Sequence, residues 1–183
     1  MATEGIAVKV QILDGTPAEI AEFLRLTEGE SGKGDADAPE VLVSGSHMES
    51  RAEVAVFVEE RGRSADTNTR VLDYVEKVRG LGVEIVAGTS ARTKDGLTDY
   101  LMIRDSGVRR FGAVAYVKPA NGGLTLRLTE NDVADIDLAR IKLRDVRPGH
   151  KYVVNCPLRD DAAVQFAVDL TMRALDKVRG GDA

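Results

Sequence analysis

The sequence predicts an α+β domain: a two-layer sandwich in which helices cover one face of a mainly antiparallel sheet of about five or six strands, with an N-terminal β-α appendage. Leu124, Leu126 and Leu128 alternate with polar residues, which is the period of a strand with one buried face. Asn121-Gly122-Gly123 precedes this strand and fits a tight hairpin. Residues 160–179 have the apolar spacing of an amphipathic helix. Together these patterns indicate a sheet packed against helices.

The chain divides into three predicted segments. Residues 1–27 are expected to form a small β-α unit, which must dock on something because it is too small to fold alone. Residues 28–48 are rich in Gly, Ser, Asp and Glu, and favour an acidic linker. Within this linker, Gly45-Ser46-His47-Met48 resembles the remnant of a cleaved purification tag, so we assign it no function. Residues 49–183 are the predicted α+β domain.

Two helices are expected before the sheet. Ser50 and Glu53 form a capping-box pattern, although the Val-rich run at 54–58 also has strand propensity. Residues 61–69 indicate a polar connection, and apolar residues at 71, 74, 75 and 78 then have helical spacing. Strands are expected at 83–87, 100–104, 110–118, 124–129, 141–143 and 152–155. A turn of helix is expected at 131–136 between two of them.

Composition indicates a globular protein of a reducing compartment. Hydrophobic residues make up 43% of the 183 residues, aromatic residues only 4%, and tryptophan is absent, so we expect an aliphatic core. Cys156 is the one cysteine, which excludes an internal disulfide and a cysteine-rich metal site. The first residues lack a basic stretch followed by an apolar run, so we expect no signal peptide. We therefore expect a cytoplasmic protein with no membrane association.

The charges are unevenly distributed along the chain. The net charge is −5, which disfavours a protein that coats nucleic acid generally. Residues 90–127, however, hold seven basic and three acidic residues, a local net charge of +4, whereas residues 1–63 hold six basic and thirteen acidic ones, a local net charge of −7. Cations beside an outward tyrosine on a sheet are how some proteins hold single strands. The candidate binding residues are Arg92, Lys94, Arg104, Arg109, Arg110, Tyr116, Lys118 and Arg127. A plain solvated strand face is the simpler interpretation of the same pattern.

Three other patterns have simpler structural explanations than chemistry. The loop 88–94 could hold a phosphate but lacks the P-loop spacing. Aspartates at 132, 135 and 137 do not match the EF-hand spacing, and helix capping accounts for them. Cys156 with His150 could be a nucleophile and base, but a single cysteine at a strand end is typical of buried packing. We expect no metal, no cofactor and no catalytic residue.

Residues from about 70 to 178 resemble small uncharacterised bacterial domains of frataxin-like, helix–sheet–helix type. The residues that carry the resemblance are Leu81-Gly82-Val83-Glu84-Ile85, Phe111-Gly112-Ala113-Val114, Leu124, Leu126, Leu128 and His150. The resemblance implies the fold. It does not imply iron binding, because true frataxins are acidic along the first helix, and here Asp73 and Glu76 are offset by three basic residues.

The sequence therefore predicts a binding module without catalysis that contacts DNA or RNA through the basic stretch. The alternative hypothesis is a protein–protein adaptor or homo-oligomeric regulatory subunit, in which the acidic N-terminal unit docks on the basic sheet of a partner or of a second copy. A third hypothesis is an enzyme that uses Cys156 or the aspartates.

Overall fold

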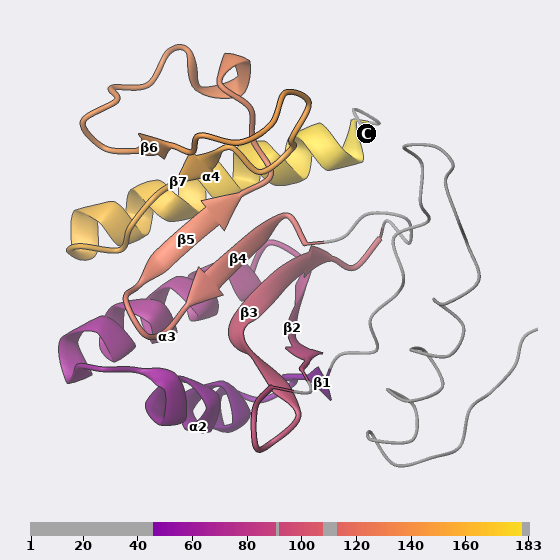
Figure 1. Cartoon of the computed structure of the whole chain (residues 1–183), viewed down its shortest axis with the longest axis vertical. Coiled ribbons are helices and arrows are strands. Elements are labelled where there is room, and N and C mark those ends of the chain that lie inside the picture. Colours follow the sequence, from indigo (N-terminus) through magenta and orange to yellow (C-terminus); the bar gives the residue numbers. More distant parts are fainter. Residues whose placement is uncertain (1–45, 91, 108–112, 181–183) are drawn as a thin grey trace, which may run out of the picture. The chain divides into compact units, whose positions relative to one another are not determined.

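The protein has an α+β fold, as predicted, with an antiparallel sheet packed against helices (Figure 1). The computed structural model describes residues 46–90, 92–107 and 113–180. The predicted β-α unit at 1–27 and most of the predicted linker lie outside the described residues. The described helices are α2 Arg51–Arg61, α3 Ala65–Arg79 and α4 Asp161–Arg179, with a short 3₁₀ helix at Asn131–Val133.

The described sheet has seven strands, slightly more than the five or six expected. They are β1 Ser46–His47, β2 Val83–Thr89, β3 Leu97–Asp105, β4 Ala115–Lys118, β5 Gly123–Leu126, β6 Lys142–Leu143 and β7 Val154–Asn155. Their order across the sheet is β1-β2-β3-β4-β5-β7-β6, and every neighbouring pair is antiparallel. Ser46 and His47 thus belong to an edge strand, although the sequence placed them in the linker.

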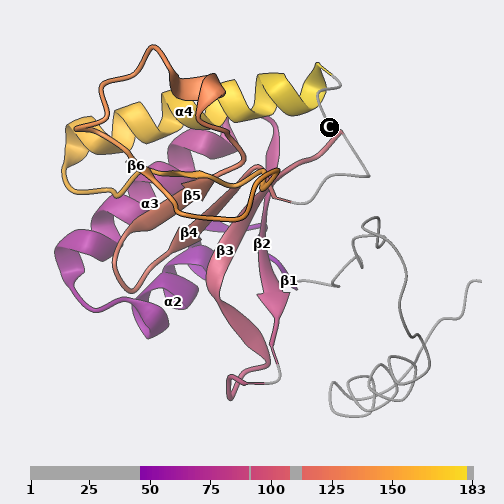
Figure 2. The same cartoon turned by 45° about the horizontal axis from the view of Figure 1, so that its top comes forward.

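The strand register gives the sheet one apolar face and one mixed face. A row of cross-strand partners faces the helices: Ile85, Ile103, Ala115, Leu126 and Val154. All of them are buried and belong to one core cluster with α2, α3 and α4, which cover this face (Figures 1 and 2). Leu124, Leu126 and Leu128 are fully buried, which confirms the predicted inward alternation.

Local capping explains where the helices begin. Ser50 and Glu53 make both hydrogen bonds of a capping box, which confirms the predicted start of α2 over the competing strand propensity. α3 begins at Ala65, earlier than the predicted polar connection allowed, because the Ser64 side chain accepts a hydrogen bond from the Thr67 amide. Asp160 caps α4 in the same way.

The segment between β5 and β6 is fastened to α4 by two ion pairs. The Asp132 carboxylate accepts hydrogen bonds from Lys177 and from the amide and hydroxyl of Thr129, at 2.6–2.7 Å. Burial alone would raise the pKa of Asp132, but these hydrogen bonds outweigh it and the pKa is lowered. Arg173 forms a two-pronged contact with Asp135. These aspartates therefore act as structural anchors of the segment.

No described helix has both the length and the apolar character that crossing a bilayer requires.

Candidate nucleic-acid interface

The candidate site lies on the sheet face opposite the helices. Cross-strand partners on this outer face include Met102, Tyr116, Thr125 and Asn155. They point away from the core because they are each one residue out of step with the buried row. Thr125 and Asn155 are joined by a side-chain hydrogen bond of 2.7 Å. The outer face is thus mixed in character, with an aromatic ring at its centre.

Three of the four tyrosines in the chain gather on this face. The Tyr100 and Tyr116 ring centroids are 5.3 Å apart in an edge-to-face arrangement. Tyr152, which comes from the segment before β7, lies 5.1 Å from Tyr116 at a tilted angle. All three side chains are half-buried. His150 lies beside Tyr152, with 6.1 Å between the ring centroids. The face therefore presents several aromatic rings with mutually supporting geometry.

Three of the predicted basic binding residues lie on the strands or directly after one. Arg104 is half-buried on β3 and is the cross-strand partner of Glu84. Lys118 is exposed at the end of β4. Arg127 is only 5% exposed, and its guanidinium lies 5.8 Å from the centre of the Tyr152 ring. Arg127 is thus a buried neighbour of the Tyr152 ring rather than a solvent-exposed cation. Arg109 and Arg110, also predicted as binding residues, lie outside the described residues.

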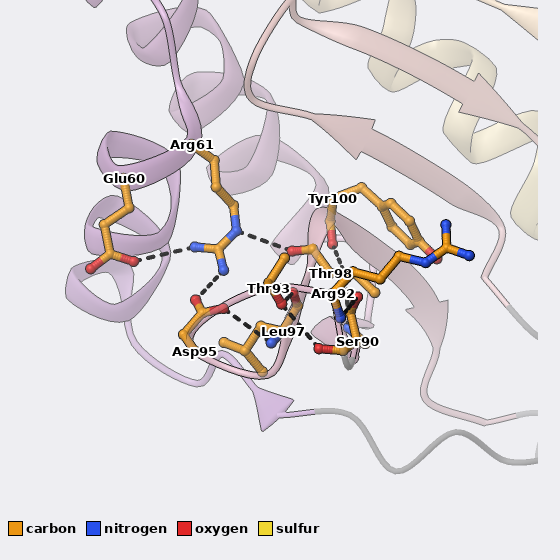
Figure 3. Close-up of polar contacts among 10 residues, drawn as sticks. Glu60, Arg61, Ser90, Arg92, Thr93, Asp95, Leu97, Thr98 and Tyr100 are labelled. Atoms are coloured by element: carbon orange, nitrogen blue, oxygen red, sulfur yellow. Dashed lines mark hydrogen bonds and ion pairs between the residues drawn. The ribbon is translucent and has the colours of Figure 1, made fainter. Parts of the chain in front are cut away.

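The β2–β3 loop presents the other two predicted cations. The Ser90 amide donates a 2.7 Å hydrogen bond to the Gly96 carbonyl, which closes the loop. The Thr93 hydroxyl contacts the carbonyls of Ser90 and Leu97 inside it. Arg92 and Lys94, on either side of Thr93, are exposed. In Figure 3, the Arg92 side chain extends toward the same side as the Tyr100 ring. The loop therefore holds two cations at the end of the sheet where Tyr100 lies.

Arg61 fastens this loop to helix α2 (Figure 3). Its Nε donates a 3.0 Å hydrogen bond to the Thr98 carbonyl, and its other nitrogens contact the carboxylates of Glu60 and Asp95. The guanidinium also lies 3.8 Å from the centre of the Phe57 ring. Hydrogen bonding from Arg61 lowers the pKa of Asp95, so its carboxylate stays ionised at neutral pH. These contacts restrain the backbone that carries the two cations.

Sequence reasoning identified one tyrosine of the three. Tyr116 was assigned to the outer face of its strand, and the structure places it there. Tyr100 was within a predicted strand, and its two-residue spacing from Met102 was the available signal for the same face. Tyr152 fell within the strand predicted at 152–155, but β7 begins only at Val154, so strand alternation does not give the face on which Tyr152 lies. The sequence shows which rings face outward on one strand but not which strands are neighbours.

The other candidate chemistries have little support in the described structure. Cys156 is buried, and burial raises the pKa of its thiol to about 11, so the thiolate is scarce at neutral pH. Nδ1 of His150 accepts a hydrogen bond from the Tyr152 amide. Within the described ranges, no group of three or more His, Cys, Asp or Glu residues is arranged to hold a metal ion.

A separate apolar groove of about 400 Å³ lies beside α2. Met48, Ala52, Val56, Phe57 and Leu97 supply its apolar lining, and Glu53, Glu60 and Arg61 are its charged members. It lies at the β1 edge of the sheet, since Ser46 also lines it.

Comparison with known proteins identified no relative. No family model matches the chain, and no curated protein or solved structure is significantly similar to it.

Proposed function

We propose that this protein is a non-enzymatic binding module that holds single-stranded nucleic acid on the outer face of its sheet. The observation that carries the proposal is the gathering of Tyr100, Tyr116 and Tyr152 on that face, with centroid distances of 5.1–5.3 Å. Stacking of a base on an aromatic side chain contributes about 1–3 kcal/mol and tolerates any base. A single strand suits this face better than a duplex, because its unstacked bases are free to reach the rings.

Exposed cations on the loop beside Tyr100 and on β4 are candidate contacts for phosphates. Arg92 and Lys94 are exposed on the fastened loop, and Lys118 is exposed at the end of β4. Such contacts release counterions, so affinity falls as salt rises, by a slope of about 0.7 per phosphate neutralised on a single strand. The overall charge of −5 opposes binding at a distance. We therefore expect moderate affinity that depends on stacking as well as on charge.

The test is fluorescence anisotropy with labelled ~12-nucleotide oligo(dT) and oligo(U), at ~50 and ~200 mM salt. Tyr100→Ala and Tyr116→Ala should each weaken binding by about 1–3 kcal/mol, which is roughly 5- to 150-fold. Arg92→Glu with Lys94→Glu should also reduce the salt slope, by about 1.4. The matched control is Arg63→Glu, which reverses an exposed charge in the connection between α2 and α3.

Two results would contradict the proposal. One is negligible affinity for both oligonucleotides at the lower salt concentration. The other is that the tyrosine variants bind the oligonucleotides as tightly as Arg63→Glu does, while circular dichroism shows that they are folded. Because the chain has no tryptophan, quenching of tyrosine emission by the oligonucleotide supplies an independent signal. Three of the four emitting residues lie on the proposed face.

The sequence-based alternative, self-association or docking of a protein partner through the acidic N-terminal residues, stays a prediction, because those residues lie outside the described ranges. Size-exclusion chromatography across a range of salt concentrations distinguishes it. Salt-sensitive oligomers would favour this alternative, and a monomer at every salt concentration would count against self-association.

A further inference from the structure

The groove beside α2 is lined by apolar side chains, and not all of them are buried in the core of the domain. Phe57 and Met48 are buried at 2% and 7% exposure and form part of the core. Val56, in contrast, is 55% exposed and lines the groove from the helix. Valine is a poorer helix former than the polar residues usual on a solvated helix face. An apolar side chain at this position therefore gains less from the fold than a buried one and offers apolar surface to a ligand.

The groove adjoins the outer edge of β1, which pairs with no other strand within the described ranges. The Met48 amide donates to the Ile85 carbonyl, so Met48 and Ser46 direct their backbone groups toward β2. By the alternation of an antiparallel ladder, the N–H and C=O of His47 then point away from β2. An extended segment laid along β1 would meet these two groups. Its side chains on one face would enter the groove.

The charged members of the groove favour a basic ligand. Hydrogen bonds from the Ser50 backbone and side chain lower the pKa of Glu53, so this carboxylate is ionised at neutral pH. Glu60 adds a second carboxylate, whose side chain is 59% exposed. The Arg61 side chain is only 10% exposed and is engaged by Glu60, Asp95 and Thr98, so this one cation lies among three carboxylates when Glu53 is included. The charge that a ligand meets at the rim of the groove is therefore negative.

We infer that this groove is a docking site for an extended segment of a partner protein whose groove-facing side chains, at every second position, include both apolar residues and Lys or Arg. The apolar side chains fill the space between Met48, Val56 and Leu97, and the basic ones meet Glu53 and Glu60. The segment adds to the β1 edge through the backbone of His47. This site is distinct from the tyrosine-bearing face, because it is built mainly on α2 and the β1 edge, with Leu97 at the start of β3, and none of the three tyrosines lines it.

The test begins with a random phage-displayed 12-mer peptide library panned against the full chain. Enriched peptides should carry apolar and basic residues together at every second position, and their synthetic copies should bind in a fluorescence-anisotropy titration. Val56→Lys should weaken that binding at least tenfold, since it removes apolar surface and adds a repelling charge. Met172→Lys is the matched control, because Met172 is an exposed hydrophobic residue on α4, at 45%, and should leave binding unchanged.

The backbone contact has its own measurement. Replacing alternate residues of a selected peptide by N-methylated ones should abolish binding in one register and spare it in the other, because only alternate residues face β1. Three outcomes would overturn the inference: no enriched peptide, which is the result expected if the chain itself or a second copy fills the groove; acidic or helical peptides; or equal affinity for Val56→Lys and Met172→Lys.

Discussion

Arg61 is the residue whose replacement should most disturb both surfaces at once, since it fastens the cationic loop and also lines the apolar groove. Arg61→Met keeps most of the aliphatic stem and removes the guanidinium. The Thr98 carbonyl then loses its donor, at a cost of about 1–3 kcal/mol if water does not replace it. Loss of the contact with the Phe57 ring adds about 0.5–2 kcal/mol.

The contact with Asp95 adds less, because the Asp95 side chain is 39% exposed and solvent screens the pair. Packing of the methionine side chain offsets part of the total. We expect a loss of about 2–4 kcal/mol in the free energy of unfolding, measured by urea titration with circular dichroism at 222 nm. Hydrogen exchange of the Ser90 amide, which donates to Gly96, should speed up more than exchange in α4.

Glu60→Gln is the control for this experiment. Glu60 also contacts Arg61, but its side chain is 59% exposed, so we expect a change within about 0.5 kcal/mol. A double-mutant cycle with Asp95→Asn isolates the ion pair from the other contacts of Arg61. The reasoning would be refuted if Arg61→Met were no more destabilising than Glu60→Gln. It would also be refuted if the loop amides exchanged at the wild-type rate.

Three further predictions concern buried and ionised groups. Thr171→Val should cost more stability in urea unfolding than Tyr74→Phe, because it leaves the buried Tyr74 hydroxyl without its 2.8 Å partner, and the double variant should cost less than the sum. Cys156 should resist iodoacetamide at pH 8 until the protein is unfolded, as mass spectrometry would show. The hydrogen bond from Arg173 holds the pKa of Asp135 at about 2, below its unfolded value, so this contribution to stability is present above about pH 4 and is lost towards pH 2. The melting temperature of Arg173→Gln should therefore fall less over that range than that of the wild type.

The inward leucines and the capping box could be predicted because each depends on residues close together in the chain. Leu124, Leu126 and Leu128 need only the two-residue period of a strand, and Ser50 with Glu53 needs only one turn of helix. The start of α3 was placed too late because Ser64 lies in a polar run with no apolar period to mark it. Ser64 is a residue type that favours an N-cap, but the polar residues around it led to the prediction of a connection rather than a helix start.

The site was less predictable because it depends on which strands are neighbours. The basic surplus at 90–127 was visible, yet the structure buries Arg127 and sets Arg104 opposite Glu84. A count of charges along a chain does not separate cations that support a ring from cations that meet solvent. The grouping of Tyr100, Tyr116 and Tyr152 requires the register of β3 and β4 and the path of the chain before β7. None of these follows from local periodicity.

The placement of the tyrosines separates a packing role from a binding role. The core is aliphatic apart from Phe57 and Tyr74, so Tyr100, Tyr116 and Tyr152 are not among the residues that fill it. If the three tyrosines only cover the outer face, Tyr100→Leu should leave the free energy of unfolding and the oligonucleotide affinity nearly unchanged. Leucine covers comparable apolar surface, and the face is already partly solvated. A group that stacks bases should lose oligonucleotide affinity with the same substitution while the free energy of unfolding changes little. Tyr100 is the residue to change first, since it sits next to the fastened loop and its ring meets Tyr116 edge-on. Both roles predict a small change in the free energy of unfolding, but only the binding role predicts a loss of oligonucleotide affinity, so the affinity of this one folded variant distinguishes them.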